Sequence, residues 1–363
     1  MLKLNEVFKF KQIIPYIHIL STFVEVMKSR KHNYTLIYTA TGIILLALFA
    51  ANIFYGPVKI PFRDVLSILF GSGSDRTSWN YIVLETRLPQ AVTALLSGAA
   101  LAISGLMLQT FFKNPLAGPS ILGISDGANL GVALVMIYFA TSSYLTTIVA
   151  AFIGAAIVLS IIIIFSRKVN NNVMLLIIGI MVGYLASSVI SILNYRASAD
   201  KVHQFVMWGM GDFSSVSTDK LPWFASFAIA GLILSITLTK PLNALLLGED
   251  YARNLGVRIR AVRLLILLST GILTATVTAF CGPISFIGLA VPHIARLLLG
   301  SSNHNHLIPV TILAGSVTAL LCNFVTLLGD ASSPLPLNAV TSLIGAPVII
   351  YVIMNRRNMH YFS

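Results

Sequence analysis

The chain has 363 residues, of which 56% are hydrophobic and only 10% are charged. A soluble domain carries about 25% charged residues, so this composition excludes a soluble globular protein and, because apolar residues dominate, a disordered one. The formal net charge of +12 does not indicate nucleic-acid binding, since the basic residues occur in short groups beside apolar segments, as in membrane proteins.

The first predicted element is a basic amphipathic arm over residues 1–33, on the cytoplasmic side. Pro15, His18 and Glu25 interrupt its apolar stretch, and no cleavage site follows, so we do not expect a signal peptide. Residues 34–354 are predicted to form one transmembrane domain, and residues 355–363 a cytoplasmic tail.

Ten apolar segments of the predicted domain suit an all-α polytopic membrane protein, in which each helix needs about 20 apolar residues to cross the bilayer. The third, seventh, eighth and tenth are short or bounded by glycine and proline. The ten segments are Tyr34–Phe54, Leu88–Phe111, Ile121–Tyr138, Leu145–Phe165, Val173–Leu193, Leu221–Leu238, Leu264–Ala279, Ile284–Leu299, Ile308–Leu328 and Ala339–Met354.

The distribution of lysine and arginine sets the orientation of these helices. Ten crossings place both termini on one side, and most of the 24 lysines and arginines lie on that side. The positive-inside rule therefore predicts that both termini are cytoplasmic, in a bacterial cytoplasmic membrane.

Two loops are too long to be simple turns. The outer loop over residues 55–87 contains an apolar group from Val65 to Phe70 that suits a helix lying along the membrane surface. The inner loop over residues 240–263 alternates acidic, small and basic residues, which is typical of a surface that docks another protein.

The motifs of catalysis are absent from the sequence. No GxxxxGK[ST], HExxH or GxSxG motif occurs, and Cys281 and Cys322 both lie in apolar segments without histidine or cysteine neighbours at metal-binding spacing. We expect no catalytic residue, no metal site and no cofactor on this chain.

Asp126, His293 and Arg296 lie near helix ends, and carboxylates at the membrane midplane, which an ion-driven carrier needs, are missing. Energy is therefore expected from outside the membrane.

Small residues recur every four positions in two of the predicted helices. Ala94, Gly98 and Ala102 do so in the second helix, where close packing of helices is the expected role. A second stripe occurs in the fifth helix, where packing and a weakly polar wall of a solute pathway are both open interpretations. Its members are Gly179, Gly183, Ser187 and Ser191.

Three motifs together resemble the FecCD family of iron-chelate and cobalamin permeases, the membrane subunits of type II ABC importers. The first runs from Arg87-Leu88-Pro89 through Gly98 to Gly105 and on to Lys113-Asn114-Pro115-Leu116-Ala117-Gly118-Pro119. The second is Leu247-Gly248-Glu249-Asp250-Tyr251-Ala252 with Leu255-Gly256-Val257. The third runs from Cys281-Gly282-Pro283 to Val291-Pro292-His293, and Gly345-Ala346-Pro347 follows it.

Several residues of these motifs are expected to have structural roles. Asn114 and Pro115 with Gly118 and Pro119 predict a reversal of the chain at the inner side, because neither proline continues a helix from the preceding residue. Gly282-Pro283 predicts the matching outer reversal. For Pro292 and His293 a helix kink and complementation of the helix dipole explain the residues as well as a family role does.

The resemblance implies that the inner loop contacts a cytoplasmic ATPase subunit. Two glycines flank a short predicted helix there, and the arginines beside it could form ion pairs with a separate protein. The residues expected to couple the two proteins are Gly248, Glu249, Asp250, Ala252, Arg253, Gly256 and Arg258.

The resemblance also implies an outer surface for a solute-binding protein, with Arg87 at one family position. Other family positions differ here: Gln90 and Leu327 stand where arginines are usual, and Asn323 stands in place of aspartate. Lys59, Arg63 and Arg76 are alternative docking cations.

The implied function is that of a permease subunit, not an enzyme, in an ATP-driven importer of a large metal chelate. A second permease subunit, identical or different, would complete the pathway, and separate ATPase subunits would bind the ATP. Ferric siderophore is the expected substrate, with haem or cobalamin as alternatives. An ion-coupled secondary carrier is the alternative of a different class.

Overall fold

The computed structural model describes residues 34–71, 73–74, 76–139, 143–169, 171–328 and 335–354. These residues form an all-helical domain without β-strands. The predicted arm over residues 1–33 and tail over residues 355–363 lie outside the described part of the chain.

The domain consists of α-helices with short π-helical and 3-10 segments between or within them. In chain order these are α2 Tyr34–Phe54, α3 Phe62–Leu69, α4 Thr77–Tyr81, η2 Ile82–Arg87, α5 Leu88–Phe112, η3 Pro119–Leu122, α6 Ile124–Ala133, η4 Leu134–Tyr138, α7 Tyr144–Lys168, α8 Asn172–Arg196, α9 Ala199–Gly209, η5 Phe213–Ser215, α10 Leu221–Thr237, α11 Thr239–Leu246, α12 Glu249–Asn254, α13 Ile259–Cys281, α14 Ile287–Leu299, α15 His304–Thr326 and α16 Leu337–Met354.

Each of the ten predicted membrane segments coincides with an apolar helix. Within the described residues, 6 helices are long and apolar enough to cross a membrane, or 7 with the bent pair α10–α11. Shorter apolar helices at Ile124–Tyr138, Ile287–Leu299 and Leu337–Val352 occupy the third, eighth and tenth positions. The seventh is not short, because α13 begins at Ile259 and has 23 residues. The predicted fold class is confirmed.

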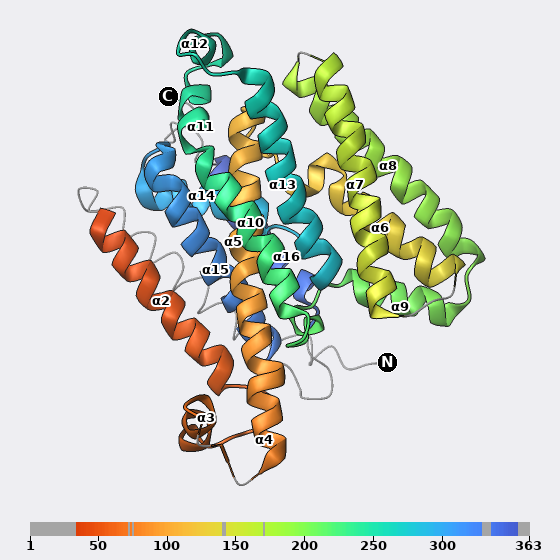
Figure 1. Ribbon diagram of the computed structural model, residues 1–363, viewed down its shortest axis with the longest axis vertical. Helices are drawn as coiled ribbons and strands as arrows, with labels where there is room; N and C mark the ends of the chain where they lie inside the picture. The colour runs from red at the N-terminus through yellow and green to blue at the C-terminus, as the bar shows by residue number, and fades with distance from the viewer. Residues whose placement is uncertain are drawn as a thin grey trace.

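Helix α5 runs through the middle of the domain, with helices from both ends of the chain around it (Figure 1). Every residue from Ser97 to Phe112 is buried. Lipid gives no hydrophobic drive for helices to associate, so close backbone approach must supply the attraction. A Cβ built on Gly98 would lie 2.2 Å from the carbonyl oxygen of Gly315 in α15. The stripe that includes Gly98 therefore packs helices together, as expected.

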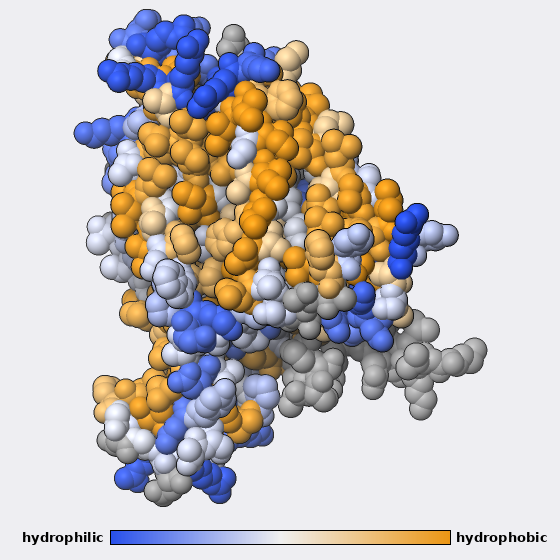
Figure 2. All heavy atoms as spheres, turned by 45° about the vertical axis from the view of Figure 1, so that its right-hand side comes forward, coloured by the Kyte–Doolittle hydropathy of each residue, from blue (hydrophilic) through white to orange (hydrophobic). Residues whose placement is uncertain are grey.

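The two ends of the domain are polar and the middle is apolar. Figure 2 shows an apolar belt between hydrophilic groups at the top and the bottom. The top, which we call the inner end, carries α11 and α12, and the bottom, the outer end, carries α3 and α4 (Figure 1). Inside the outer loop, Val65 and Ile68 are buried. Val65 and Ile68 therefore pack on the protein, whereas Phe62 and Phe70 are 64% and 83% exposed, and a position of α3 along the membrane surface stays a prediction.

Both predicted reversals are present. At the inner end Lys113 adopts a positive φ of 49°, and the Asn114 side chain accepts a hydrogen bond from the amide of Leu116 (2.9 Å). At the outer end Gly282 has a φ of 74°, a conformation that favours glycine. These turns send α6 back from the inner end and α14 back from the outer end.

Candidate functional site

The inner loop forms a short helix, α12, as its glycines predict. Gly248 and Gly256 flank it with φ values of 116° and 83°, which glycine adopts without the steric penalty of a side chain. Ala252 is fully buried and anchors α12 to the domain. The other side of α12 is left free for a partner.

Glu249 faces the domain rather than the partner side. Its Oε1 accepts a hydrogen bond from Asn172 Nδ2 (3.0 Å) and lies 3.5 Å from the Arg263 guanidinium. Arg263 also donates to the carbonyl oxygens of Ser166 and Val169, each at 3.1 Å. Glu249 thus joins α12 to the inner ends of α7, α8 and α13, so any part it takes in coupling is through the position of α12.

The outward side of α12 carries both charge and exposed apolar surface. Asp250 and Arg253 form an ion pair of 3.7 Å with side-chain exposures of 97% and 68%, and Arg258 is also exposed. Sequence reasoning missed three apolar residues spaced four apart. Leu247, Tyr251 and Leu255 are 63%, 52% and 59% exposed. We call these three, with Asp250 and Arg253, the coupling face; a large exposed apolar group rimmed by charge is typical of a protein-binding surface.

A network of buried polar side chains connects this end to α5. His304 Nδ1 lies 3.0 Å from Asn243 Oδ1 in α11, and its Nε2 lies 2.9 Å from Thr110 Oγ1 in α5. Next along α5, Gln109 accepts a hydrogen bond from Arg296 (2.6 Å). Buried polar groups of this kind fix the relative positions of their helices. The network therefore ties α11, and α12 after it, to the centre of the domain.

His293 belongs to the inner turn. Its Nε2 lies 2.7 Å from the Pro115 carbonyl oxygen. A Cβ built on Gly118 would lie 3.8 Å from the Cβ of Leu289, which is ordinary van der Waals contact. Pro119 is buried, and Pro292 lies inside α14. The predicted structural motif residues are therefore brought together where α5, η3 and α14 meet.

Arg87 is buried at the outer end, with 5% of its surface exposed. Its guanidinium donates to the carbonyl oxygens of Ile53 (3.0 Å), Phe54 (3.2 Å) and Val58. The charge is therefore shielded from solvent, and the guanidinium N–H groups bind carbonyl groups at and just after the end of α2. Docking by Arg87 stays a prediction that this geometry does not favour. Lys59, Arg63 and Arg76 are exposed on the same outer loop.

Gln90 and Asn323, where the resemblance leads us to expect arginine and aspartate, contact one another. Gln90 Nε2 donates to Asn323 Oδ1 (3.0 Å), and Asn323 Nδ2 donates to Asn52 Oδ1 (2.7 Å). Asn52 and Asn323 are each only 2% exposed. Gln90, Asn323 and Asn52 thus form a neutral hydrogen-bonded chain between α5, α15 and α2.

This contact predicts strong coupling between the two positions. Asn323→Asp alone should bury a carboxylate against Asn52 Oδ1 and lower stability by about 3 kcal/mol, whereas adding Gln90→Arg should recover about half of the loss by forming an ion pair. Thermal unfolding of the four members of this mutant cycle in detergent gives the coupling energy. If the stability changes of the two single variants add up to that of the double variant, the contact between positions 90 and 323 is contradicted.

The stripe in α8 divides into two parts. Gly179 and Gly183 are buried against η3 and α6, where an added Cβ would lie 3.0 Å from Leu122 Cα and 2.5 Å from Asp126 Oδ2, respectively. Close packing explains both glycines. Ser187 and Ser191 lie on the exposed part of α8. A pathway role for the four residues stays a prediction, and the exposed serines are the two whose position suits it.

The described residues contain no group of three or more side chains suited to hold a metal ion. Both cysteines, Cys281 and Cys322, are buried and free.

Comparison with known proteins gives consistent matches over most of the chain. The model of the FecCD transport family matches residues 44–355. The chain is 34% identical to the hemin transport system permease protein HmuU of Yersinia pestis, over 87% of this chain and 93% of that one. It is 32% identical to the iron-uptake system permease protein FeuB of Bacillus subtilis, over 91% and 98%. It is 37% identical to the vitamin B12 import system permease protein BtuC of Salmonella paratyphi A, over 75% and 83%.

A solved structure has the same fold. It is described as an inward-facing conformation of a metal-chelate type ABC transporter, and it matches with a TM-score of 0.78 and 29% sequence identity. The match covers 88% of this chain and 99% of that one.

Proposed function

The chain belongs to the FecCD transport family, and from this premise we propose that it forms, with a second permease subunit, the pathway of an ATP-driven importer for a ferric siderophore. At the coarser level it is a multi-pass membrane protein and the permease subunit of an ABC importer for metal chelates. The observation that carries the iron assignment is the match with the iron-uptake permease of B. subtilis, which extends over 98% of that protein. Haem and cobalamin are the competing substrates, because permeases for both are similar to this chain.

The coupling face is the proposed binding surface for the ATPase subunit. Its apolar residues Leu247, Tyr251 and Leu255 supply the area that an interface buries, and Asp250 and Arg253 supply polar contacts at its rim. Movement imposed on α12 reaches α11 directly and then α15 and α5 through Asn243 and His304. This connection supports a mechanism in which ATP hydrolysis outside the membrane tilts the central helices.

The outer loop is the proposed contact with a solute-binding protein. Lys59, Arg63 and Arg76 are exposed there and would attract an acidic partner. Arg87 would act indirectly, by holding the base of this loop on the end of α2.

Reconstitution tests the proposed substrate. We expect ATP hydrolysis by this chain, assembled in lipid with its ATPase subunits, to rise several-fold when a binding protein loaded with ferric siderophore is added. Equal amounts of the unloaded binding protein and of one loaded with haem or cobalamin are the controls. Stimulation by haem or cobalamin alone would overturn the siderophore assignment and leave the importer class intact. Uptake that survives ATP depletion and stops when ion gradients are dissipated would indicate the secondary carrier instead.

A further inference from the structure

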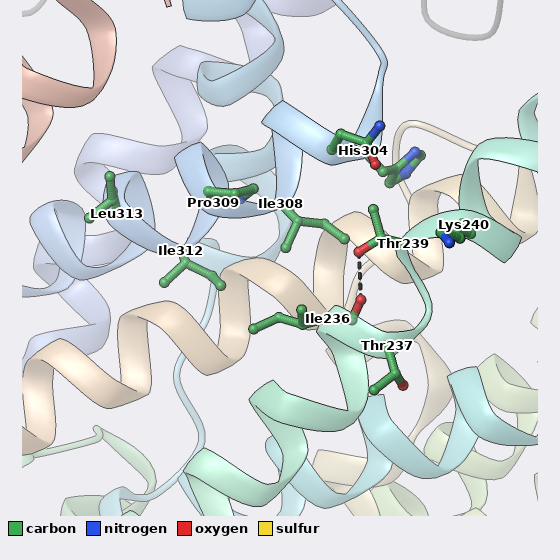
Figure 3. A pocket seen from close by; sticks show the side chains of 10 residues that line it. Ile236, Thr237, Thr239, Lys240, His304, Ile308, Pro309, Ile312 and Leu313 are labelled. Atoms are coloured by element: carbon green, nitrogen blue, oxygen red, sulfur yellow. Dashed lines mark hydrogen bonds between the residues drawn. The ribbon is translucent and has the colours of Figure 1, made fainter. Parts of the chain in front are cut away.

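A groove with a volume of about 830 Å³ lies at the inner end, between the α10–α11 bend and α15. The bend between α10 and α11 is 49°, and beyond it Asn243 of α11 contacts His304 of α15. Figure 3 shows Ile308 and Ile312 of α15 on one side of the groove and Ile236 and Thr239 on the other. Its lining comes from α10, α11 and α15, all of which belong to apolar spans.

The groove has an apolar part and a polar part that includes one lysine. Ile236, Ile308, Ile312 and Leu313 line its apolar part, and Lys240 is the charged residue of its lining. Lys240 is exposed, and among the described residues its ammonium has neither a hydrogen bond nor an acidic partner. Pro309, also in the lining, has no amide hydrogen, so the carbonyl of Asn305 lacks its usual helical donor.

We propose that this groove binds a phospholipid with an anionic headgroup from the inner leaflet. An acyl chain would lie along Ile308 and Ile312, and the phosphate would meet Lys240. This occupant suits both parts of the groove, because hydrocarbon can cover the isoleucines and an anionic phosphate can pair with the Lys240 ammonium. Basic pockets between membrane helices on the cytoplasmic side are recognised sites for acidic headgroups.

The site would also connect two helices that the transport cycle must move. Lys240 belongs to α11, which leads directly into α12, and Ile308 and Ile312 belong to α15. A lipid held by both helices would favour the arrangement in which they are bridged. The lipid site itself does not depend on which chelate is transported.

The first test compares lipids of different charge on the full-length chain, purified in the complex that it forms. Native mass spectrometry with phosphatidylglycerol and phosphatidylcholine of identical acyl chains should show preferential retention of phosphatidylglycerol. Lys240→Gln should reduce that preference about fivefold, the effect of one basic residue near an anionic headgroup. The matched control is Lys168→Gln, which removes an exposed lysine from the inner end of α7. Equal preference in the two variants, or none in the wild type, would overturn the proposal.

The second test identifies the occupant. A photoreactive residue at position 236 should form an adduct with the mass of a phospholipid, and Ile308 and Ile312 lie across the groove from it. Ile236 is 51% exposed, so the substitution leaves the packed interior intact. A crosslink to a second copy of the chain, or to residues 1–33, would show that protein fills the groove and would overturn the lipid assignment.

Discussion

Gly105→Ala should abolish recovery of the folded protein. A Cβ at position 105 would lie 1.6 Å from the carbonyl oxygen of Gly288, far inside contact distance, and the atoms it meets are backbone. The clash can be relieved only by separating α5 from α14, which also breaks the contact of Arg296 with Gln109. Overpacking of a core costs about 1–3 kcal/mol, and a backbone clash at a buried helix crossing is expected to exceed this range. The measurement is the yield of a single symmetric peak on size-exclusion chromatography after solubilisation.

Gly42→Ala is the matched control for this result. Gly42 is also a helical glycine, in α2, but nothing lies within 4 Å of a Cβ added there. The substitution should leave the yield unchanged or raise it, because alanine favours a helix over glycine by about 1 kcal/mol. Equal yields of folded protein for Gly105→Ala and Gly42→Ala would contradict the close backbone contact between α5 and α14.

The helices could be predicted because composition and length decide them. A segment of about 20 apolar residues has no alternative to a helix in lipid, and the longer of the ten segments were predicted on that basis; the shorter ones were predicted from the glycines, prolines and charges that bound them. The seventh was predicted too short because Arg263 was treated as a boundary. The arginine lies inside α13, where its Nη1 donates to the carbonyl oxygens of Ser166 and Val169. A charged residue is therefore not by itself the end of a helix when the fold supplies partners for it.

The candidate sites were predicted less completely, because they depend on which side of a short element is buried. The glycines of the inner loop indicated α12, but six residues are too few for a periodicity that separates the inward Glu249 from the outward Tyr251. The burial of Arg87 depends on three carbonyl groups around residues 53–58. The partnership of Gln90 with Asn323 joins residues 233 positions apart, and no local pattern in one sequence reveals it.

Tyr251→Asp should remove the ATPase subunit from the purified complex while the membrane domain stays folded. Tyr251 belongs to the coupling face and is 52% exposed. Tyrosines at the centre of an interface contribute 2 kcal/mol or more, roughly thirtyfold in affinity, and an aspartate there would add an unpaired charge. The amount of ATPase that co-purifies with the permease, normalised to permease recovered as a single peak, measures the effect.

Two further variants make this test specific for the coupling face. Tyr195→Asp carries the same change at a tyrosine that is 91% exposed at the outer end of α8, and it should retain the ATPase. Glu249→Gln keeps the acceptor for Asn172 but weakens the contact with Arg263, so it should lower thermal stability more than ATPase binding. Glu249→Arg would not separate these effects, because it sets two guanidinium groups against each other at the inner end of α13. If Tyr251→Asp binds ATPase as the wild type does and Glu249→Gln does not, the partner contacts the inward side of the loop, and the coupling face defined by Tyr251 is wrong.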